Sequence, residues 1–146
     1  MARKVLIATH GHLASGFKSA VQILLGSSYE PETICAYTEE EPGDYSGRIK
    51  AFLDSVGPDD EGVIFTDLAG GSVNQKVMQV NQPPHPNVYV ITESNLMTII
   101  AILLEGSPLT AEGIEALISQ SSPMLAKFEV VAGSENSAED ADAFLS

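Results

Sequence analysis

Two residues that can do chemistry each follow a strand-like segment of the sequence. His10 comes directly after the apolar run 4–9, and Asp67 comes directly after the apolar run 62–66. Apolar runs of this length that end in polar residues are typical of strands buried on both faces. An imidazole whose Nδ1–H is held by a carboxylate presents a neutral Nε2 lone pair, so it acts as a nucleophile or a base. If the two strands are neighbours, the pair predicts a reactive histidine.

A short glycine-rich segment follows Asp67. Gly70 and Gly71 let the backbone approach another group closely, and a helix that begins near Ser72 points N–H groups at an anion. A histidine nucleophile beside such a helix terminus indicates phosphoryl transfer rather than acyl transfer. The chain has no lysine-bearing P-loop, and no paired acidic residues follow the first strand to hold Mg²⁺. A nucleotide-dependent kinase is therefore disfavoured, and we predict neither a metal nor a cofactor.

Each of these residues also has a plain structural explanation. A single strand-end histidine is often only hydrogen-bonded, an aspartate there often serves a turn, and the glycines could form a loop with a helix cap. We interpret His12 as a neighbour of the site rather than a ligand and Cys35 as inert core. We expect His85 to be a solvent-exposed loop residue on the opposite side of the sheet, and residues 39–41, all glutamate, to be a solvated loop.

The elements that would position these residues alternate along the chain. Helical patterns separate the apolar strands, and one of them places Phe17, Ala20, Val21, Leu24 and Leu25 on a single stripe. This alternation predicts an α/β, single-domain, doubly wound and mainly parallel sheet with helices on both faces. Ligands of such sheets gather at the carboxyl ends of the strands. Strands are expected at 4–9, 33–37, 62–66, 87–91 and 127–131, and helices after each of the first four, at about 17–25, 45–56, 72–80 and 95–104, with a further one at 110–119.

Composition excludes several classes of function. The 146 residues suit one domain spanning 1–146, and the net charge of −13 argues against binding to nucleic acid or to an anionic membrane. Cys35 is the only cysteine, so no intramolecular disulfide and no cysteine cluster for zinc is expected. The apolar stretches 5–8 and 96–104 are too short for a signal peptide core or a membrane span, so we expect a cytoplasmic protein. The acidic segment 134–146 reads as a C-terminal tail.

Two motifs stand out in the sequence. The segment VLIATHG at 5–11 precedes a helix that ends in Leu24-Leu25-Gly26, and the segment FTDLAGGSVN spans 65–74. Together they resemble the IIA components of the mannose family of the phosphoenolpyruvate-dependent sugar phosphotransferase system, whose D-x-x-G-G-S-P-x-N motif is similar to the second segment, with Val73 in place of proline. Both motifs occur in the family's order and spacing, and the resemblance covers about residues 3 to 132.

The resemblance implies a phosphotransferase that works through a phosphohistidine. His10 would accept a phosphoryl group on Nε2 from the histidine phosphocarrier protein and pass it to a IIB component, with membrane IIC and IID proteins downstream in sugar uptake. Asp67 would orient His10, and Ser72 with nearby amides, from Gly70 and Gly71 onward, would hold the phosphoryl oxygens. Thr9 and Asn95 are expected as walls of the site. The resemblance also implies a homodimer that exchanges the last, antiparallel strand at 127–131.

Three alternatives remain open from the residues. The same fold and phosphohistidine could serve a dihydroxyacetone kinase as its phosphoryl donor subunit. Phosphorylation of His10 could act only as a regulatory signal. A flavodoxin-like binding module could use residues 70–72 to hold a nucleotide or flavin phosphate. The sugar is not readable from the sequence, because a IIA component does not touch it.

Overall fold

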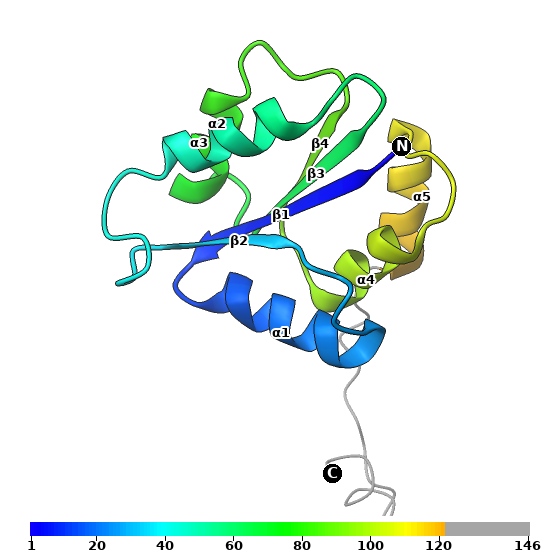
Figure 1. The fold of residues 1–146 in the computed structure, drawn as a ribbon, viewed down its shortest axis with the longest axis horizontal. Helices are drawn as coiled ribbons and strands as arrows, with labels where there is room; N and C mark the ends of the chain where they lie inside the picture. The colour runs from blue at the N-terminus through cyan, green and yellow to red at the C-terminus, as the bar shows by residue number, and fades with distance from the viewer. Residues whose placement is uncertain (122–146) are drawn as a thin grey trace, which may run out of the picture.

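A computed structural model describes residues 1–121 of the chain (Figure 1). Strands and helices alternate as the sequence predicts. The predicted strand at 127–131 and the acidic tail at 134–146 lie outside the described residues. The elements are β1 (Arg3–His10), α1 (Leu13–Leu25), β2 (Glu32–Ala36), α2 (Ser46–Ser55), β3 (Glu61–Thr66), α3 (Ser72–Val80), β4 (Val88–Ile91), α4 (Leu96–Leu104) and α5 (Ala111–Ser121).

The four described strands form one parallel sheet in the order β2-β1-β3-β4. In this register Ala8 of β1 lies beside Thr66 of β3, and His10 lies beside Ala36 of β2. The carboxyl ends of β1 and β3 are therefore adjacent, as the proposed contact between His10 and Asp67 requires.

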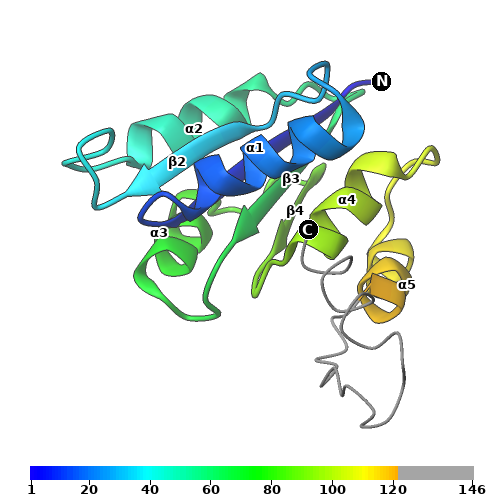
Figure 2. The ribbon, with the colours of Figure 1, turned by 90° about the horizontal axis from the view of Figure 1, so that it is seen from below.

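Helices cover both faces of the sheet, so the predicted α/β fold class is confirmed. Figure 1 shows α2 and α3 on one side of the strands and α1, α4 and α5 on the other, and Figure 2, seen from below, shows α1 across β1 and β2. The central strand β1 is buried on both faces: Leu6 and Ala8 pack in the core under α2 and α3, and Val5 and Ile7 pack in the core under α1, α4 and α5. The helix after β1 and the helix after β3 thus lie on opposite faces. The carboxyl ends of β1 and β3 therefore form the switch point, the place at which such sheets bind ligands.

Two sequence-based expectations about side chains are wrong. Leu24 was expected on the buried stripe of α1, but it is exposed, because the helix packs through Ala14, Val21 and Leu25 and turns Leu24 away from the sheet.

His85 does lie in a loop at the amino ends of the strands, but its side chain is half-buried. Its Nδ1 accepts a hydrogen bond from the N–H of Asn87 at 3.4 Å, and its own N–H donates to Asn81.

Helix α4 consists almost entirely of apolar residues, and it covers the sheet with Ile99 and Ile102 fully buried. It has nine residues. Within residues 1–121 no helix is long and apolar enough to cross a membrane.

Candidate functional site

His10 and Asp67 meet at the switch point between β1 and β3. The Nδ1 atom of His10 lies 2.8 Å from Oδ2 of Asp67, and the same oxygen accepts the backbone N–H of His10, also at 2.8 Å. The second carboxylate oxygen, Oδ1, accepts the N–H of Leu68 at 3.0 Å. Ring and backbone of His10 are thus held by one carboxylate, which the parallel register brings within reach.

The charge of Asp67 determines which ring nitrogen of His10 carries the proton. Burial by itself would raise the pKa of Asp67, but the hydrogen bonds from the backbone and ring of His10 and from Leu68 outweigh burial and lower the pKa below its ordinary value. An ionised carboxylate only accepts hydrogen bonds, so Nδ1 carries the ring proton. The lone pair of the neutral imidazole is therefore on Nε2.

Nε2 of His10 faces a pair of hydroxyl groups. Ser72 Oγ lies 3.2 Å from Nε2, and the hydroxyl of Tyr37 lies 2.7 Å from Ser72 Oγ. The ring of Tyr37 also lies against the imidazole, with centroids 5.5 Å apart. A second tyrosine, Tyr45, is buried and interacts with Tyr37. Burial, and then the interaction with Tyr37, raises the pKa of Tyr45 to about 12, so the Tyr45 hydroxyl stays protonated at neutral pH. With a lone pair on Nε2, the consistent chain of donors runs from Tyr37 through Ser72 to His10.

The loop after β3 is held by its own hydrogen bonds. The N–H of Ala69 donates to Glu93 Oε1 at 2.7 Å, the N–H of Gly70 to Asn74 Oδ1 at 3.1 Å, and the N–H of Gly71 to Leu68 O at 3.0 Å. Gly70 has a φ of 70°, which favours glycine. These three amides are all engaged, so they are not a free cradle for a phosphate.

Gly71 lets the loop approach the histidine. A Cβ at this position would lie 3.1 Å from Leu68 and 3.5 Å from Cε1 of His10. Gly71 is also the N-cap of α3, so the first turn of that helix, beginning at Ser72, starts beside the ring. The N–H groups of a first helical turn have no acceptor within the helix, and the helix dipole favours an anion there. The site can therefore accept a negatively charged group next to Nε2, whose ring is 38% exposed.

The predicted site residues fall into two groups. His10, Asp67, Gly71 and Ser72 lie together, and Gly70 shapes the loop that joins them. The side chains of Thr9 and Asn95, expected as walls, each accept a backbone N–H group at the start of a helix. Thr9 is fully buried, and its Oγ1 accepts the N–H of Ala14 at 2.8 Å, which anchors the start of α1.

Asn95 is the N-cap of α4, where its side chain accepts the N–H of Thr98 at 3.0 Å. It lines a cavity of about 360 Å³ beyond β4 together with Thr92 and Ile118. Its contribution is to the start of the helix rather than to the wall of the histidine site.

Sequence reasoning missed two residues of this site. Tyr37 was placed at the end of the second predicted strand without a role, and Glu93 was given no role. They are the two non-glycine residues in the described part of the chain with positive φ, 65° and 50°. A side chain held in this sparsely populated region is often functional. Their place shortly after parallel strands was a usable signal, but their partners were not visible in the sequence.

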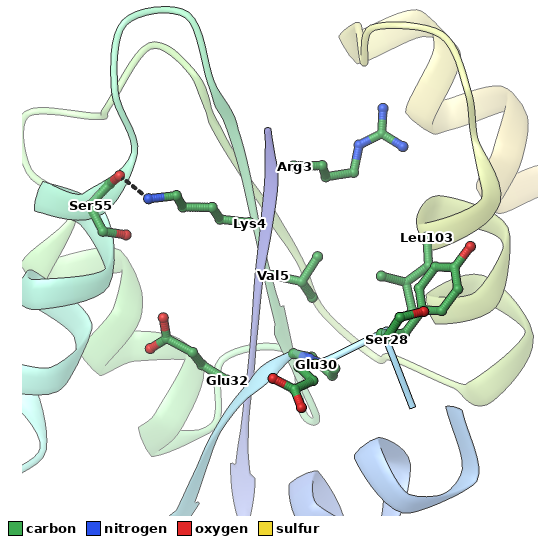
Figure 3. Close-up of a pocket in the computed structure, with 10 residues that line it drawn as sticks. Arg3, Lys4, Val5, Ser28, Glu30, Glu32, Ser55 and Leu103 are labelled. Carbon is green, nitrogen blue, oxygen red and sulfur yellow. Dashed lines mark hydrogen bonds between the residues drawn. The ribbon is translucent and has the colours of Figure 1, made fainter. Parts of the chain in front are cut away.

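A pocket of about 420 Å³ lies at the opposite end of the sheet, among the starts of β1 and β2 and the ends of α1, α2 and α4 (Figure 3). Its cationic side chains are engaged. Lys4 Nζ donates to Ser55 O at 2.5 Å, and the guanidinium of Arg3 binds Glu61 and the carbonyls of Ile102 and Ser107. None of the predicted site residues lines this pocket.

Comparison with protein families and solved structures gives a consistent likeness. The model of the family described as the phosphotransferase system (PTS) fructose IIA component matches residues 4–112. A crystal structure from Klebsiella pneumoniae, described as a phosphoenolpyruvate-dependent sugar PTS permease, is 29% identical with a TM-score of 0.66. The match covers 83% of this chain and 84% of the other.

Two further structures share the fold. The mannose/sorbose specific IIA subunit from Enterococcus faecalis has a TM-score of 0.74 at 19% identity, over 90% of this chain and all of the other. The PTS IIA protein associated with the fucose utilization operon of Streptococcus pneumoniae has a TM-score of 0.72 at 20% identity, over 87% of this chain and 93% of the other.

Proposed function

Because the chain belongs to the fructose IIA component family of the sugar phosphotransferase system, it is a phosphoryl carrier of that system, and we propose that Nε2 of His10 carries the phosphoryl group. The observation that supports this most directly is the two-sided environment of the ring. Nδ1 is held by an ionised carboxylate, and Nε2 faces a hydroxyl and a helix N-terminus.

The proposed step is an in-line transfer between two histidines. The Nε2 lone pair of His10 attacks the phosphorus of a phosphohistidine on the phosphocarrier protein. As the new N–P bond forms, the old N–P bond breaks and its electron pair returns to the donor imidazole. The positive charge that develops on His10 is stabilised by Asp67 through Nδ1–H. Transfer to a histidine of a IIB component is the same step in reverse.

Ser72 and Tyr37 are proposed to stabilise the phosphoryl oxygens. The Ser72 hydroxyl lies beside the atom that is to be phosphorylated, so after transfer its O–H can donate to a phosphoryl oxygen, while Tyr37 holds Ser72 in place. The amides of the first turn of α3 supply further donors and the positive end of the helix dipole. Gly70 and Gly71 allow the close approach and spend their own N–H groups inside the loop.

The rim of the site fits protein partners. Leu13, Tyr37 and Leu68 are exposed apolar side chains on three segments that end or begin beside His10. Exposed aromatic and aliphatic groups at one spot are typical of a protein interface. We propose that the phosphocarrier and the IIB component both dock on this rim, and that the relay operates in the cytoplasm with IIC and IID proteins downstream.

We further propose that the protein is a homodimer. Helices α1 and α4 contact each other and leave Ile23, Leu24, Met97 and Leu104 exposed, and exposed apolar side chains on adjacent helices suit a subunit interface. Exchange of a strand at 127–131 between subunits remains a prediction. Sedimentation should give a dimer, and truncation before Lys127 should give monomer or insoluble protein. A monomer at tens of micromolar would contradict the proposal.

The deciding experiment is a labelling reaction. The untagged protein is mixed with labelled phosphoenolpyruvate, enzyme I and the phosphocarrier, and acid-labile, alkali-stable label should appear on His10. With a separately phosphorylated carrier, transfer should also proceed in EDTA, because the helix terminus and Ser72 replace the metal of a kinase. Label on another residue would refute the assignment of His10, and a strict Mg²⁺ requirement or tight ATP binding would favour a nucleotide site.

A further inference from the structure

Three potential metal ligands, two exposed and one buried, lie together next to the histidine site. Within residues 1–121, one ligand atom from each of His12, Cys35 and Glu40 lies within 4.8 Å of the other two. The set combines a nitrogen, a sulfur and a carboxylate oxygen. It is separate from the pair of His10 and Asp67, and the phosphoryl transfer proposed above does not use it.

The backbone brings these residues together without any ligand. His12 is the N-cap of α1, and Cys35 pairs with Thr9 across the β1–β2 ladder, with its side chain in the core under α1. The N–H of Gly11, at a φ of 59°, donates to Ala36 O at 2.9 Å and holds the loop that bears His12 against β2. The site is therefore fixed by the sheet on one side.

The third ligand comes from the turn after β2. Thr38 Oγ1 donates to Cys35 O at 2.7 Å and accepts the N–H of Glu40 at 3.2 Å. These bonds fold the turn back over the end of β2. Glu40 thus lies above the buried thiol of Cys35 and on the same side as His12.

The histidine ring is close to the arrangement of a metal ligand. Its Nε2 lies 3.2 Å from Glu39 Oε1, whereas its Nδ1 lies 4.0 Å from Glu40 Oε1. The second distance is too long for a hydrogen bond. Two ligands of a tetrahedral ion that each lie about 2.0–2.2 Å from it are about 3.5 Å apart, so a small side-chain movement would bring this pair to one ion. Metal-binding histidines commonly donate their other ring N–H to a carboxylate, which is the position of Glu39.

We propose that His12 Nδ1, the Cys35 thiolate and the Glu40 carboxylate bind a thiophilic divalent cation such as Zn²⁺, with Glu39 orienting the His12 ring. A sulfur and an imidazole suit zinc and disfavour Mg²⁺ and Ca²⁺, which prefer oxygen ligands. Binding replaces the S–H bond of Cys35 with a metal–sulfur bond and releases the proton to solvent. His12 and Glu40 are half exposed, so the ion can reach the site and a water molecule can fill the fourth position.

The test is a titration of the full, tag-free chain with Co²⁺ alone and then with Zn²⁺ alone. One equivalent of Co²⁺ should produce a sulfur-to-cobalt charge-transfer band and the intense visible bands of a four-coordinate ion, and Zn²⁺ should displace it. Cys35→Ser and His12→Ala should abolish the charge-transfer band. Glu39→Gln should weaken binding by about 10- to 100-fold, as loss of a carboxylate partner does in other metal sites.

Matched controls use the other two histidines and an acidic residue at the far end of the sheet. His10→Ala, His85→Ala and Glu32→Gln should keep the band. Absence of the band in the wild-type protein, or its survival in His12→Ala, would overturn the proposal. Loss of the band in His10→Ala would overturn it too, because the ion would then lie at the phosphoryl site. Since Cys35 is buried, circular dichroism checks the fold of Cys35→Ser, and the surface variant His12→Ala decides the outcome if that protein does not fold.

Discussion

Each end of the parallel sheet carries a carboxylate that is paired with a basic side chain. At the amino ends of the strands, Glu61 binds Arg3 at 2.5 Å, and at the carboxyl ends Asp67 binds His10 at 2.8 Å. The two carboxylates are almost equally buried, with side chains 8% and 10% exposed. The bases differ, because Arg3 is 13% exposed and His10 is 38% exposed.

The difference lies in where the remaining polar atoms point. The other donors of Arg3 bind carbonyl groups at and beyond the end of α4, and the second oxygen of Glu61 accepts the N–H of Leu109. That pair is closed inside the protein, so it joins β1 to the segment around α4. The second ring nitrogen of His10, Nε2, lies in an exposed position beside the Ser72 hydroxyl. A buried carboxylate therefore does not identify a reactive site; a reactive atom left facing solvent does.

The largest expected effect is the loss of phosphoryl acceptance in His10→Ala. The nucleophile is absent in this variant, whereas a half-exposed side chain at a strand end contributes little to the core, so the thermal unfolding midpoint should stay close to that of the wild type. Labelling with phosphorylated carrier and calorimetry measure the two quantities. His12→Ala and His85→Ala serve as controls that keep the label, and label retained in His10→Ala would exclude the assignment.

At the opposite end, Glu61→Ala should lower stability without changing chemistry. Removing one partner of a buried ion pair leaves the other charge uncompensated and costs about 3 kcal/mol or more. For a chain of this size that corresponds to a fall of roughly 10 °C in the unfolding midpoint. Glu32→Ala, an exposed glutamate at the same end, should change stability little. A slower transfer rate in folded Glu61→Ala would mean that the two ends of the sheet are coupled.

Asp67→Asn should slow transfer to His10 by at least tenfold, which is about 1.4 kcal/mol of barrier or more. The amide keeps the shape but loses the charge that stabilises the developing imidazolium, and it does not enforce a proton on Nδ1. Stability should change by only ~1 kcal/mol, the net value of a hydrogen bond. Rapid-quench kinetics measure the rate, and equal rates for both proteins would leave Asp67 as a turn residue only.

Tyr37→Phe should reduce the transfer rate by only a few-fold. The ring stays against His10, but the hydroxyl that holds Ser72 is lost, and one neutral hydrogen bond is worth about 0.5–1.5 kcal/mol. Tyr29→Phe, at the amino end of the sheet, is the matched control and should transfer at the wild-type rate. A Tyr37→Phe protein as fast as the wild type would mean that Ser72 needs no support.

The smallest expected effect is on stability in acid. The pKa of Asp67 is lowered in the folded protein, so its hydrogen bonds stabilise the fold fully above the unfolded pKa of about 4 and lose this effect as pH falls through the lower folded pKa. The difference in free energy of unfolding between wild type and Asp67→Asn should therefore be constant near neutral pH and shrink below about pH 4. Denaturant titrations over this range measure it, and a gap that widens in acid would contradict the assigned direction.

The sequence determined the order of the elements and the two strand ends that carry the chemistry. Apolar runs buried on both faces identify parallel strands because of their continuous hydrophobicity, and His10, Asp67 and Ser72 were recognised since they follow those runs. The caps at Thr110 and Gly26 are also local, because in each the donor and acceptor are close in sequence.

Only the tertiary structure decided which residues from separate segments meet. Tyr37 reaches Ser72 and Glu93 reaches Ala69 across 35 and 24 residues, at strand ends whose proximity depends on the sheet order. The same holds for His12, Cys35 and Glu40. Taken one at a time in the sequence, they were interpreted as a neighbour of the site, an inert core residue and part of a solvated loop. Thr9 and Asn95 were expected as walls of the site, but the sequence did not show that their side-chain oxygens accept backbone N–H groups at the starts of α1 and α4. Side-chain partners far apart in sequence depend on register and loop geometry, and a one-dimensional pattern does not contain these.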